Sequence, residues 1–279
     1  WSSGVEVSVV PADVTVLDQG DVAIIAVNTQ YLDAGGDDEV CFIAFKDIKP
    51  GTSIELTDNG YERVHPGFWG NTEATIRITY QGAADIVAGT PICLQGAGAL
   101  ASDFQVQVCG VNTPTDWNIT SLNGNLFQFN LNATDQVWIF QNGAWNAGVQ
   151  SPAQHNATYN GNVLWGWTAS GWETAPGFAS TSGSTLVQGT ECFNINTQIP
   201  NADKVKYTGP LTAANQSEWV ARIGNVANWT GYANNAAYNG VSGRDYSGSC
   251  VAFTVNSGGF QAGLWTGAAS TDWFSCSNW

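Results

Sequence analysis

Short apolar runs separated by turn residues recur along this chain. The first run covers residues 21–28, and a second at residues 40–46 follows an acid-rich loop. A Pro-Gly turn then leads into an alternating stretch at residues 52–57, which ends in Asp-Asn-Gly. Because turns favour Pro, Gly, Asn and Asp, this part of the sequence predicts a β-meander.

Further candidate strands follow at short intervals. They are expected at residues 73–80, 91–95, 104–109, 125–130, 135–141, 163–167, 185–187 and 251–255. Many short strands with turn signals between them predict an all-β, jelly-roll-like β-sandwich rather than alternating β/α units. One short helix is expected at residues 217–224, with Ser217 as its N-cap and Trp219, Val220 and Ile223 as its apolar stripe.

The first residues predict an N-terminal extension strand. Val5, Val7 and Val9 alternate with polar residues, which gives the strand one apolar face. Pro11 then interrupts the run, because proline cannot extend a central ladder. Two alternatives follow: an edge strand folded back onto its own domain, or a strand donated to a neighbouring molecule.

Composition indicates a globular chain with a neutral-polar surface. Hydrophobic residues make up 43% of the 279 positions, but charged residues only 11%, against a usual ~25%. Three regions are expected: an N-terminal arm at 1–19, a β-sandwich domain at 20–255 and a Trp-rich tail at 256–279. The chain starts at Trp1 without a signal peptide, so we expect a processed chain or part of a longer product.

The charge balance argues against two classes of partner. The net charge is −15, and the eight basic residues are scattered along the chain. No basic run could neutralise a phosphate backbone, so we expect no nucleic-acid binding and no attraction to an anionic membrane surface. No apolar stretch reaches the ~20 residues of a membrane-spanning helix, so we expect no membrane insertion.

The six cysteines are even in number and widely spaced, with no Cys-x-x-Cys pair. Disulfides are the expectation for an extracellular chain, although six cysteines allow fifteen connectivities and buried free thiols remain the alternative. Cys93 and Cys109 flank a Gly-rich turn between two strand-like runs, so this pair is expected to be bonded.

Asn-x-Ser/Thr triplets are candidate glycosylation sites on the surface. They are Asn118, Asn132, Asn156, Asn215 and Asn228.

The acid-rich loop before the second apolar run is the best candidate for a metal site. Hard oxygen ligands on a glycine-containing loop suit Ca²⁺. We expect weak Ca²⁺ binding at most, with Asp37, Asp38 and Asp58 as oxygen donors. The alternative is a solvated acidic turn, because the loop lacks the spacing of a specific calcium motif.

Catalytic patterns are not evident. There are only two histidines and no Gly-x-Ser-x-Gly elbow, so no catalytic residue is assigned and the chain is not expected to be an enzyme. Aromatic platforms bind sugars, and among the 13 tryptophans Trp165, Trp167 and Trp172 are close in sequence, with Trp165 and Trp167 on one strand face. Core packing is the stronger alternative for most of them. Glycoside hydrolysis by a carboxylate pair ranks third.

Several ordered blocks resemble a family of secreted bacterial surface β-domains. The blocks are the Thr-Asp-Asn-Gly turn at 57–60, the strand 135–140, residues 201–209, and the helix followed by residues 225–229 with its Asn-Trp ending. A threonine replaces the family's glycine before Asp135. The resemblance covers about residues 20–230 and implies an extracellular location and a β-fold, but no activity.

The free N-terminal strand also gives the chain a looser resemblance to extracellular filament proteins that assemble by strand donation. This resemblance implies a structural subunit of a filament or surface layer, secreted or on the cell surface, whose partner is another copy of itself. The alternative is a carbohydrate-binding surface adhesin, with glycans as partners.

Overall fold

The computed structural model describes most of the chain between residues 13 and 255. The described ranges are 13–29, 38–62, 67–96, 100–109, 111–112, 114–124, 129–132, 134–148, 156–174, 183–246 and 249–255. The predicted donor residues Val5, Val7 and Val9 and the predicted tail at 256–279 lie outside them.

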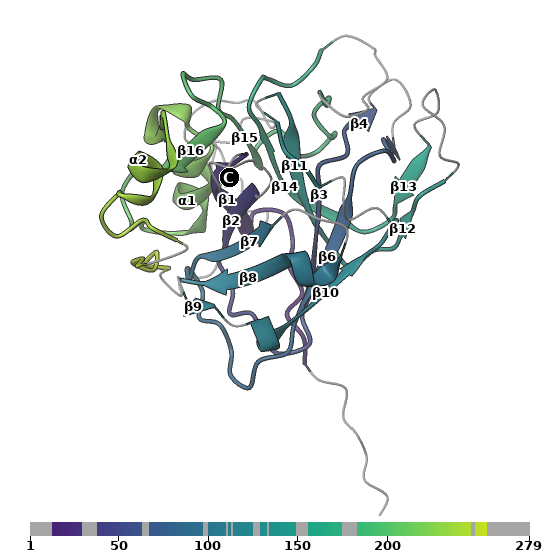
Figure 1. Cartoon of the computed structure of the whole chain (residues 1–279), viewed down its shortest axis with the longest axis horizontal. Helices are drawn as coiled ribbons and strands as arrows, with labels where there is room; N and C mark the ends of the chain where they lie inside the picture. Colours follow the sequence, from purple (N-terminus) through teal and green to yellow (C-terminus); the bar gives the residue numbers. More distant parts are fainter. Residues whose placement is uncertain are drawn as a thin grey trace, which may run out of the picture.

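Two β-sheets face each other and form a sandwich, so the all-β prediction is confirmed (Figure 1). The first sheet has seven strands in the order β17-β16-β1-β2-β7-β8-β9. Their bounds are β1 Val22–Asn28, β2 Asp38–Ala44, β7 Ile92–Gly96, β8 Phe104–Val108, β9 Val111–Asn112, β16 Lys204–Tyr207 and β17 Trp229–Gly231.

The second sheet has six strands in the order β10-β6-β3-β11-β14-β15. Their bounds are β3 Ser53–Thr57, β6 Thr75–Tyr80, β10 Trp117–Ser121, β11 Gln136–Gln141, β14 Asn162–Thr168 and β15 Asn194–Asn196. A four-stranded sheet, β12-β13-β5-β4, supplies a further layer. Its strands are β4 Tyr61–Glu62, β5 Phe68–Trp69, β12 Trp145–Asn146 and β13 Ala157–Tyr159.

Successive side chains of β11 point to opposite faces of the sheet and so belong to two different hydrophobic clusters. Val137 and Ile139 of β11 face the main core between the two large sheets, together with Trp165 and Trp167 of β14. Trp165 and Trp167 therefore share a strand face, as predicted, and both are fully buried in the core. Trp138, from the opposite face of β11, belongs to a second cluster that the four-stranded sheet covers.

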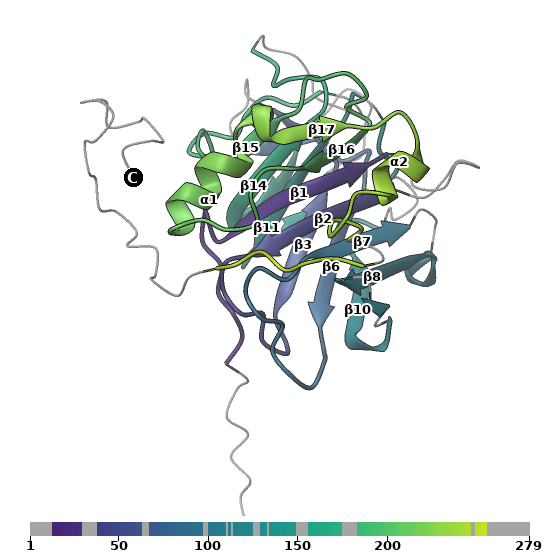
Figure 2. The ribbon, with the colours of Figure 1, turned by 90° about the vertical axis from the view of Figure 1, so that its left-hand side faces the viewer.

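Helices and the segment 249–255 lie against the outer side of the seven-stranded sheet (Figure 2). Helix α1 spans Gln216–Ile223, and its N-cap is Asn215, whose side chain accepts a hydrogen bond from the Glu218 N–H at 2.9 Å. The prediction of Ser217 as the cap is therefore wrong; an asparagine two residues earlier satisfies the free N–H equally well. The predicted stripe of Trp219, Val220 and Ile223 is buried, as expected. No pattern in the sequence predicted the short helix α2, Asn235–Asn239.

Three short 3-10 helices complete the regular structure of the described residues: η1 Ala101–Asp103, η2 Pro114–Asp116 and η4 Val226–Asn228. Of the late strand predictions, 185–187 and 251–255 are reduced to isolated bridges at Thr185 and Thr254. At 125–130, only residues 129–130 are described, and they are not strand. No helix of the described residues is long and apolar enough to cross a membrane.

The two disulfides of the described residues differ from the pairing that was expected from the sequence. Cys41 is bonded to Cys93, directly across the β2–β7 ladder, with their Cα atoms 4.0 Å apart. Cys109 is bonded to Cys250. The expected Cys93–Cys109 pair is therefore wrong, because antiparallel register places Cys93 opposite Cys41 and Gln107, not opposite Cys109. None of the described cysteines is a free thiol.

Candidate functional site

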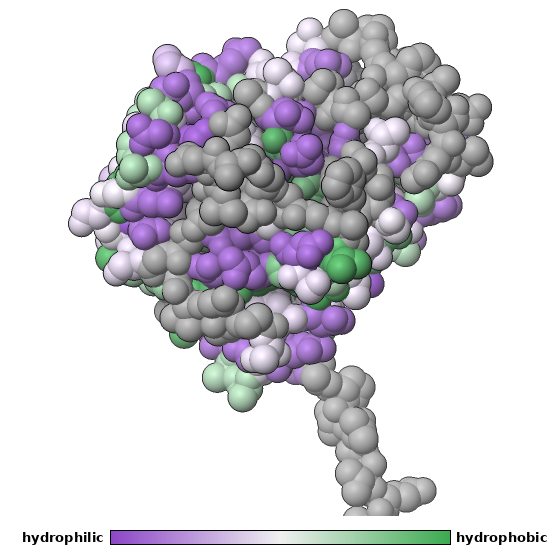
Figure 3. Space-filling model, viewed as in Figure 1, coloured by the Kyte–Doolittle hydropathy of each residue, from purple (hydrophilic) through white to green (hydrophobic). Residues whose placement is uncertain are grey.

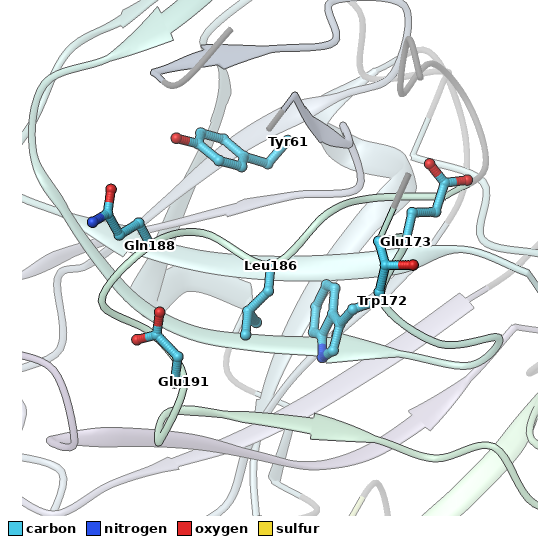
Figure 4. Close-up of a pocket in the computed structure, with 7 residues that line it drawn as sticks. Tyr61, Trp172, Glu173, Leu186, Gln188 and Glu191 are labelled. Atoms are coloured by element: carbon cyan, nitrogen blue, oxygen red, sulfur yellow. The ribbon is translucent and has the colours of Figure 1, made fainter. Parts of the chain in front are cut away.

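A pocket of about 530 Å³ opens beside the second hydrophobic cluster (Figure 4). Its lining combines aromatic and aliphatic surface with carboxylate, amide and hydroxyl groups. The described lining residues are Tyr61, Trp172, Glu173, Thr174, Leu186, Gln188 and Glu191. They come from β4 and from the two segments that flank residues 175–182, so residues distant in sequence form the pocket.

Ser184 and Thr185 connect β4 to the opposite wall of the pocket. The Tyr61 N–H donates to Ser184 Oγ at 2.9 Å, and Thr185 Oγ1 donates to the Tyr61 carbonyl at 3.0 Å. The Glu173 N–H donates to the Ser184 carbonyl at 2.9 Å. Ser184 is 1% exposed, so these bonds are shielded from water and fix the pocket walls relative to each other.

A row of aromatic rings supports Trp172, the half-buried indole that lines the pocket. The ring centroids of Trp172 and Trp138 are 4.8 Å apart, those of Trp138 and Trp69 are 5.8 Å apart, and those of Trp69 and Tyr61 are 4.9 Å apart. The Trp172 indole N–H donates to Asn194 Oδ1 at 2.9 Å, which sets the ring orientation. A half-buried indole held on both sides is a pre-formed apolar platform.

Polar groups stand around this platform. Glu173, Gln188 and Glu191 are exposed, and Glu191 Oε1 accepts a hydrogen bond from the Gly189 N–H at 3.2 Å. Figure 4 shows the Glu173 and Glu191 carboxylates on different sides of the pocket, not pointing toward one another. The arrangement can accept hydrogen bonds from a hydroxylated ligand on the indole, but it does not aim two carboxylates at one bond.

A second feature is the extended segment that precedes β1. The Thr15 N–H donates to Thr52 Oγ1 at 2.9 Å, and the Leu17 N–H donates to Gln141 Oε1 at 2.6 Å. Gln141 Nε2 donates in turn to the Thr15 carbonyl at 3.0 Å. Side chains of Gln141 in β11 and of Thr52, just before β3, thus take the place of a neighbouring strand and hold residues 15–17 against the six-stranded sheet.

The same segment keeps a strand-like alternation. Thr15 and Leu17 are buried, whereas Val14 and Val16 are 41% and 53% exposed. An ion pair between Asp13 and Lys49 fixes its first described residue, with 2.5 Å between the charged atoms. In both ribbon views this purple segment runs to the lower end of the sandwich (Figures 1 and 2).

The structure places two of the three predicted calcium ligands near one another, in buried positions. Asp38 is 2% and Asp58 1% exposed, and Asp37 lies outside the described residues. The Leu131 N–H donates to Asp38 Oδ2 at 2.6 Å, and the neighbouring Asn130 N–H donates to Asp58 Oδ2 at 3.3 Å. The alternative of a solvated acidic turn is therefore wrong for Asp38 of that loop, whose carboxylate accepts a backbone hydrogen bond in the interior.

Among the described residues, the group with metal-ligand spacing is a different one, formed by Glu39, Cys41 and Cys93. Its two sulfur atoms belong to the disulfide, so no thiolate is available to a metal. Glu39 Oε1 instead accepts a hydrogen bond from the Tyr238 hydroxyl at 2.6 Å, and Lys206 Nζ lies 3.8 Å from the Tyr238 ring centroid. Burial raises the pKa of Glu39 and lowers that of Lys206 to about 8.

The candidate glycosylation sites differ in accessibility. Asn118, Asn132 and Asn215 are exposed, whereas Asn156 and Asn228 are half-buried. Asn228 Nδ2 donates to the Arg222 carbonyl at 2.9 Å, and Asn132 Nδ2 donates to the Asn130 carbonyl at 3.3 Å.

Sequence reasoning named Trp172 as one of three candidate sugar-binding tryptophans, but it predicted no pocket and missed the other lining residues. A usable signal existed, since Trp172, Glu173 and Thr174 place an aromatic ring, a carboxylate and a hydroxyl in a turn-rich stretch. Tyr61 and Glu191 carry no such signal, because only tertiary hydrogen bonds bring their segments together.

Comparisons with family models, curated proteins and solved structures give no match to this chain. The resemblance to secreted bacterial surface β-domains therefore stays a prediction.

Proposed function

We propose that this protein is a structural subunit of an extracellular filament or surface layer that polymerises by donating its N-terminal strand to a neighbouring subunit. The observation that carries the proposal is the anchored segment before β1. Residues 15–17 are fixed to the end of the sandwich by hydrogen bonds from and to side chains. A fixed anchor gives the start of the domain a defined orientation, which a regular polymer built through the preceding residues requires.

Edges for an added strand are present in both main sheets. Among the described strands, β17 and β9 are the outermost strands of one sheet, and β10 and β15 those of the other. An edge strand has free backbone N–H and C=O groups that a donated strand satisfies. Val5, Val7 and Val9 would then pack into an apolar groove of the recipient and contribute about 1.5 kcal/mol or more each. A head-to-tail contact of this kind produces an open filament unless its rotation closes a ring.

Disulfides and surface composition support an extracellular location. Disulfides persist in oxidising compartments, and two pairs are formed among the described cysteines. On the face in Figure 3 the coloured surface is mainly hydrophilic, with hydrophobic residues in small separate groups. Such a surface suits a protein exposed to the external medium.

Negative-stain electron microscopy tests strand donation. The intact protein is expected to form fibres, and deletion of residues 1–10 to leave a folded monomer. A matched pair of variants sharpens the test: Val7→Asp places a charge on the apolar face, whereas Ser8→Asp places it on the opposite face. Only Val7→Asp should abolish fibres. Fibres from the truncated protein, or equal effects of the two variants, would contradict the proposal.

A carbohydrate-binding adhesin is the second candidate, favoured by the pre-formed platform of Trp172. Sugar rings pack on indole faces while their hydroxyls bond to carboxylate and amide groups of the kind that surround this ring. On a glycan array, Trp172→Ala is expected to abolish binding that Trp172→Phe largely retains. An array on which the intact protein binds no glycan would remove this candidate.

A further inference from the structure

We infer that Cys192 is bonded to Cys276, and that this third disulfide fastens the tryptophan-rich tail, residues 256–279, beside the pocket that Trp172 lines. Cys192 is itself disulfide-bonded. The other four described cysteines are paired with one another, so none of them is its partner. The chain has six cysteines, and the one that remains is Cys276.

The bond needs no oxidant beyond the one that the other disulfides need. Its formation joins the two Sγ atoms and releases two protons and two electrons. The electrons pass by thiol–disulfide exchange to a disulfide-bearing oxidant.

Cys192 lies in a turn that is held against the pocket. It is half-buried, and it directly follows Glu191, one of the lining residues. Asn194 Nδ2 donates to the carbonyls of Thr190 at 2.8 Å and of Glu191 at 3.0 Å. Asn194 Oδ1 accepts a hydrogen bond from the Trp172 indole N–H at 2.9 Å. One side chain thus fixes both the turn and the aromatic platform, so a segment bonded to Cys192 lies next to the pocket.

The chain reaches the start of the tail close to this turn. The Trp219 indole N–H of α1 donates to the Thr254 carbonyl at 3.2 Å. At the end of α1, a Cβ on Gly224 would lie 3.3 Å from the Asn194 carbonyl oxygen. Only about 8 Å of helix separates these two contacts. Residues 256–275 can span up to about 70 Å, so their length easily allows the connection.

Two tryptophans of the tail are close enough to the bond to reach the pocket. Trp273 precedes Cys276 by three positions and Trp279 follows it by three, a distance that the chain covers within about 10 Å. The tail has one charged residue, Asp272, so it offers apolar surface rather than ion pairs. Aromatic rings pack favourably on one another, and Trp172 is the half-buried ring at this site. An indole of the tail therefore packs over Trp172, and breaking the disulfide uncovers it.

Chymotryptic mapping of the full chain without a reductant tests the bond. Cleavage after aromatic residues and leucine releases residues 187–193, which contain Cys192, and residues 275–279, which contain Cys276. We expect one species with the combined mass of both fragments, which separates on reduction. Alkylation of either cysteine before reduction would overturn the bond. A fragment linked to a second copy of itself would also overturn it, because it indicates a bond between two subunits.

Hydroxyl-radical footprinting, read for each residue by mass spectrometry, tests where the tail lies. Cys276→Ser releases the tail, and Trp172 should then be oxidised about twofold more than in the wild type, since the covering indole is gone. Ser277→Ala, at the position after Cys276, is the matched control and should leave Trp172 as in the wild type. Trp145, 9% exposed in the second hydrophobic cluster, should stay unchanged in both variants.

Increased oxidation of Trp145 would reveal misfolding of Cys276→Ser, and Cys192→Ser then provides the same comparison from the other side of the bond. Equal oxidation of Trp172 in the wild type and in a folded variant without this bond would overturn the position of the tail, whatever the mapping shows. Neither experiment involves the N-terminal strand, so its failure is distinguishable from failure of the filament proposal.

Discussion

Replacing Gly166 with alanine should disturb the aromatic row behind the pocket. Gly166 of β14 lies directly opposite Trp138 of β11, and the indole covers the space that a side chain would occupy. A Cβ at position 166 would lie 2.5 Å from Trp138 Cζ3 and 2.8 Å from Cε3. Favourable carbon–carbon contacts are about 3.5–4.0 Å, so the ring has to move by about 1 Å.

The ring has little room for this movement. Trp138 is fully buried, and its centroid is 5.8 Å from that of Trp69 and 4.8 Å from that of Trp172. Its indole N–H also donates to Ser184 Oγ at 3.3 Å. Overpacking of a core costs about 1–3 kcal/mol, while alanine gains roughly 0.5–1 kcal/mol over glycine in backbone entropy. The expected net loss for Gly166→Ala is therefore about 1–2 kcal/mol.

Guanidinium unfolding followed by tryptophan fluorescence would measure this loss, and near-ultraviolet circular dichroism would report the ring displacement. Trp138→Leu removes the clashing atoms, so in that background Gly166→Ala should cost less than about 0.5 kcal/mol. If Trp172 is a sugar platform, its displacement should also weaken glycan binding. A Gly166→Ala protein as stable as the wild type, with an unchanged near-ultraviolet spectrum, would refute this reasoning.

Three further predictions concern the disulfide, the helix cap and the buried lysine. The double variant Cys41→Ala/Cys93→Ala should lose about 4 kcal/mol of unfolding free energy, because the bond spans 52 residues; denaturation that shows a loss below 1 kcal/mol would contradict it. Asn215→Ala should cost about 1 kcal/mol through loss of the α1 cap, with Ser217→Ala nearly neutral in the same denaturation assay. Since the pKa of Lys206 is lowered to about 8 from 10.5, the folded state binds fewer protons than the unfolded state between these values. Stability should therefore rise from pH 8 to 10.5, by up to about 3 kcal/mol. In pH-dependent denaturation, Lys206→Met should lack this rise, and an identical pH profile would argue against it.

Local patterns predicted a large part of the fold. The apolar run at residues 21–28 and the alternating run at 52–57 became β1 and β3 because side-chain periodicity needs no knowledge of the partner strand. The helix was predicted within one residue of Gln216–Ile223 for the same reason. The strand Lys204–Tyr207 was missed, since its two lysines look exposed in the sequence, yet Lys206 is fully buried beneath Tyr238.

By itself the sequence determined the all-β class, the positions of most early strands and the shared face of Trp165 and Trp167, because each depends on residues adjacent in the chain. The tertiary structure alone decided the Cys41–Cys93 pairing, since strand register fixes which cysteines face each other. It also decided the pocket between Tyr61 and Trp172, and the hydrogen bonds that bring Asp38 and Asp58 to residues 130 and 131. These groups lie far apart in sequence, and they meet only because strand order in the folded sheets places their segments side by side.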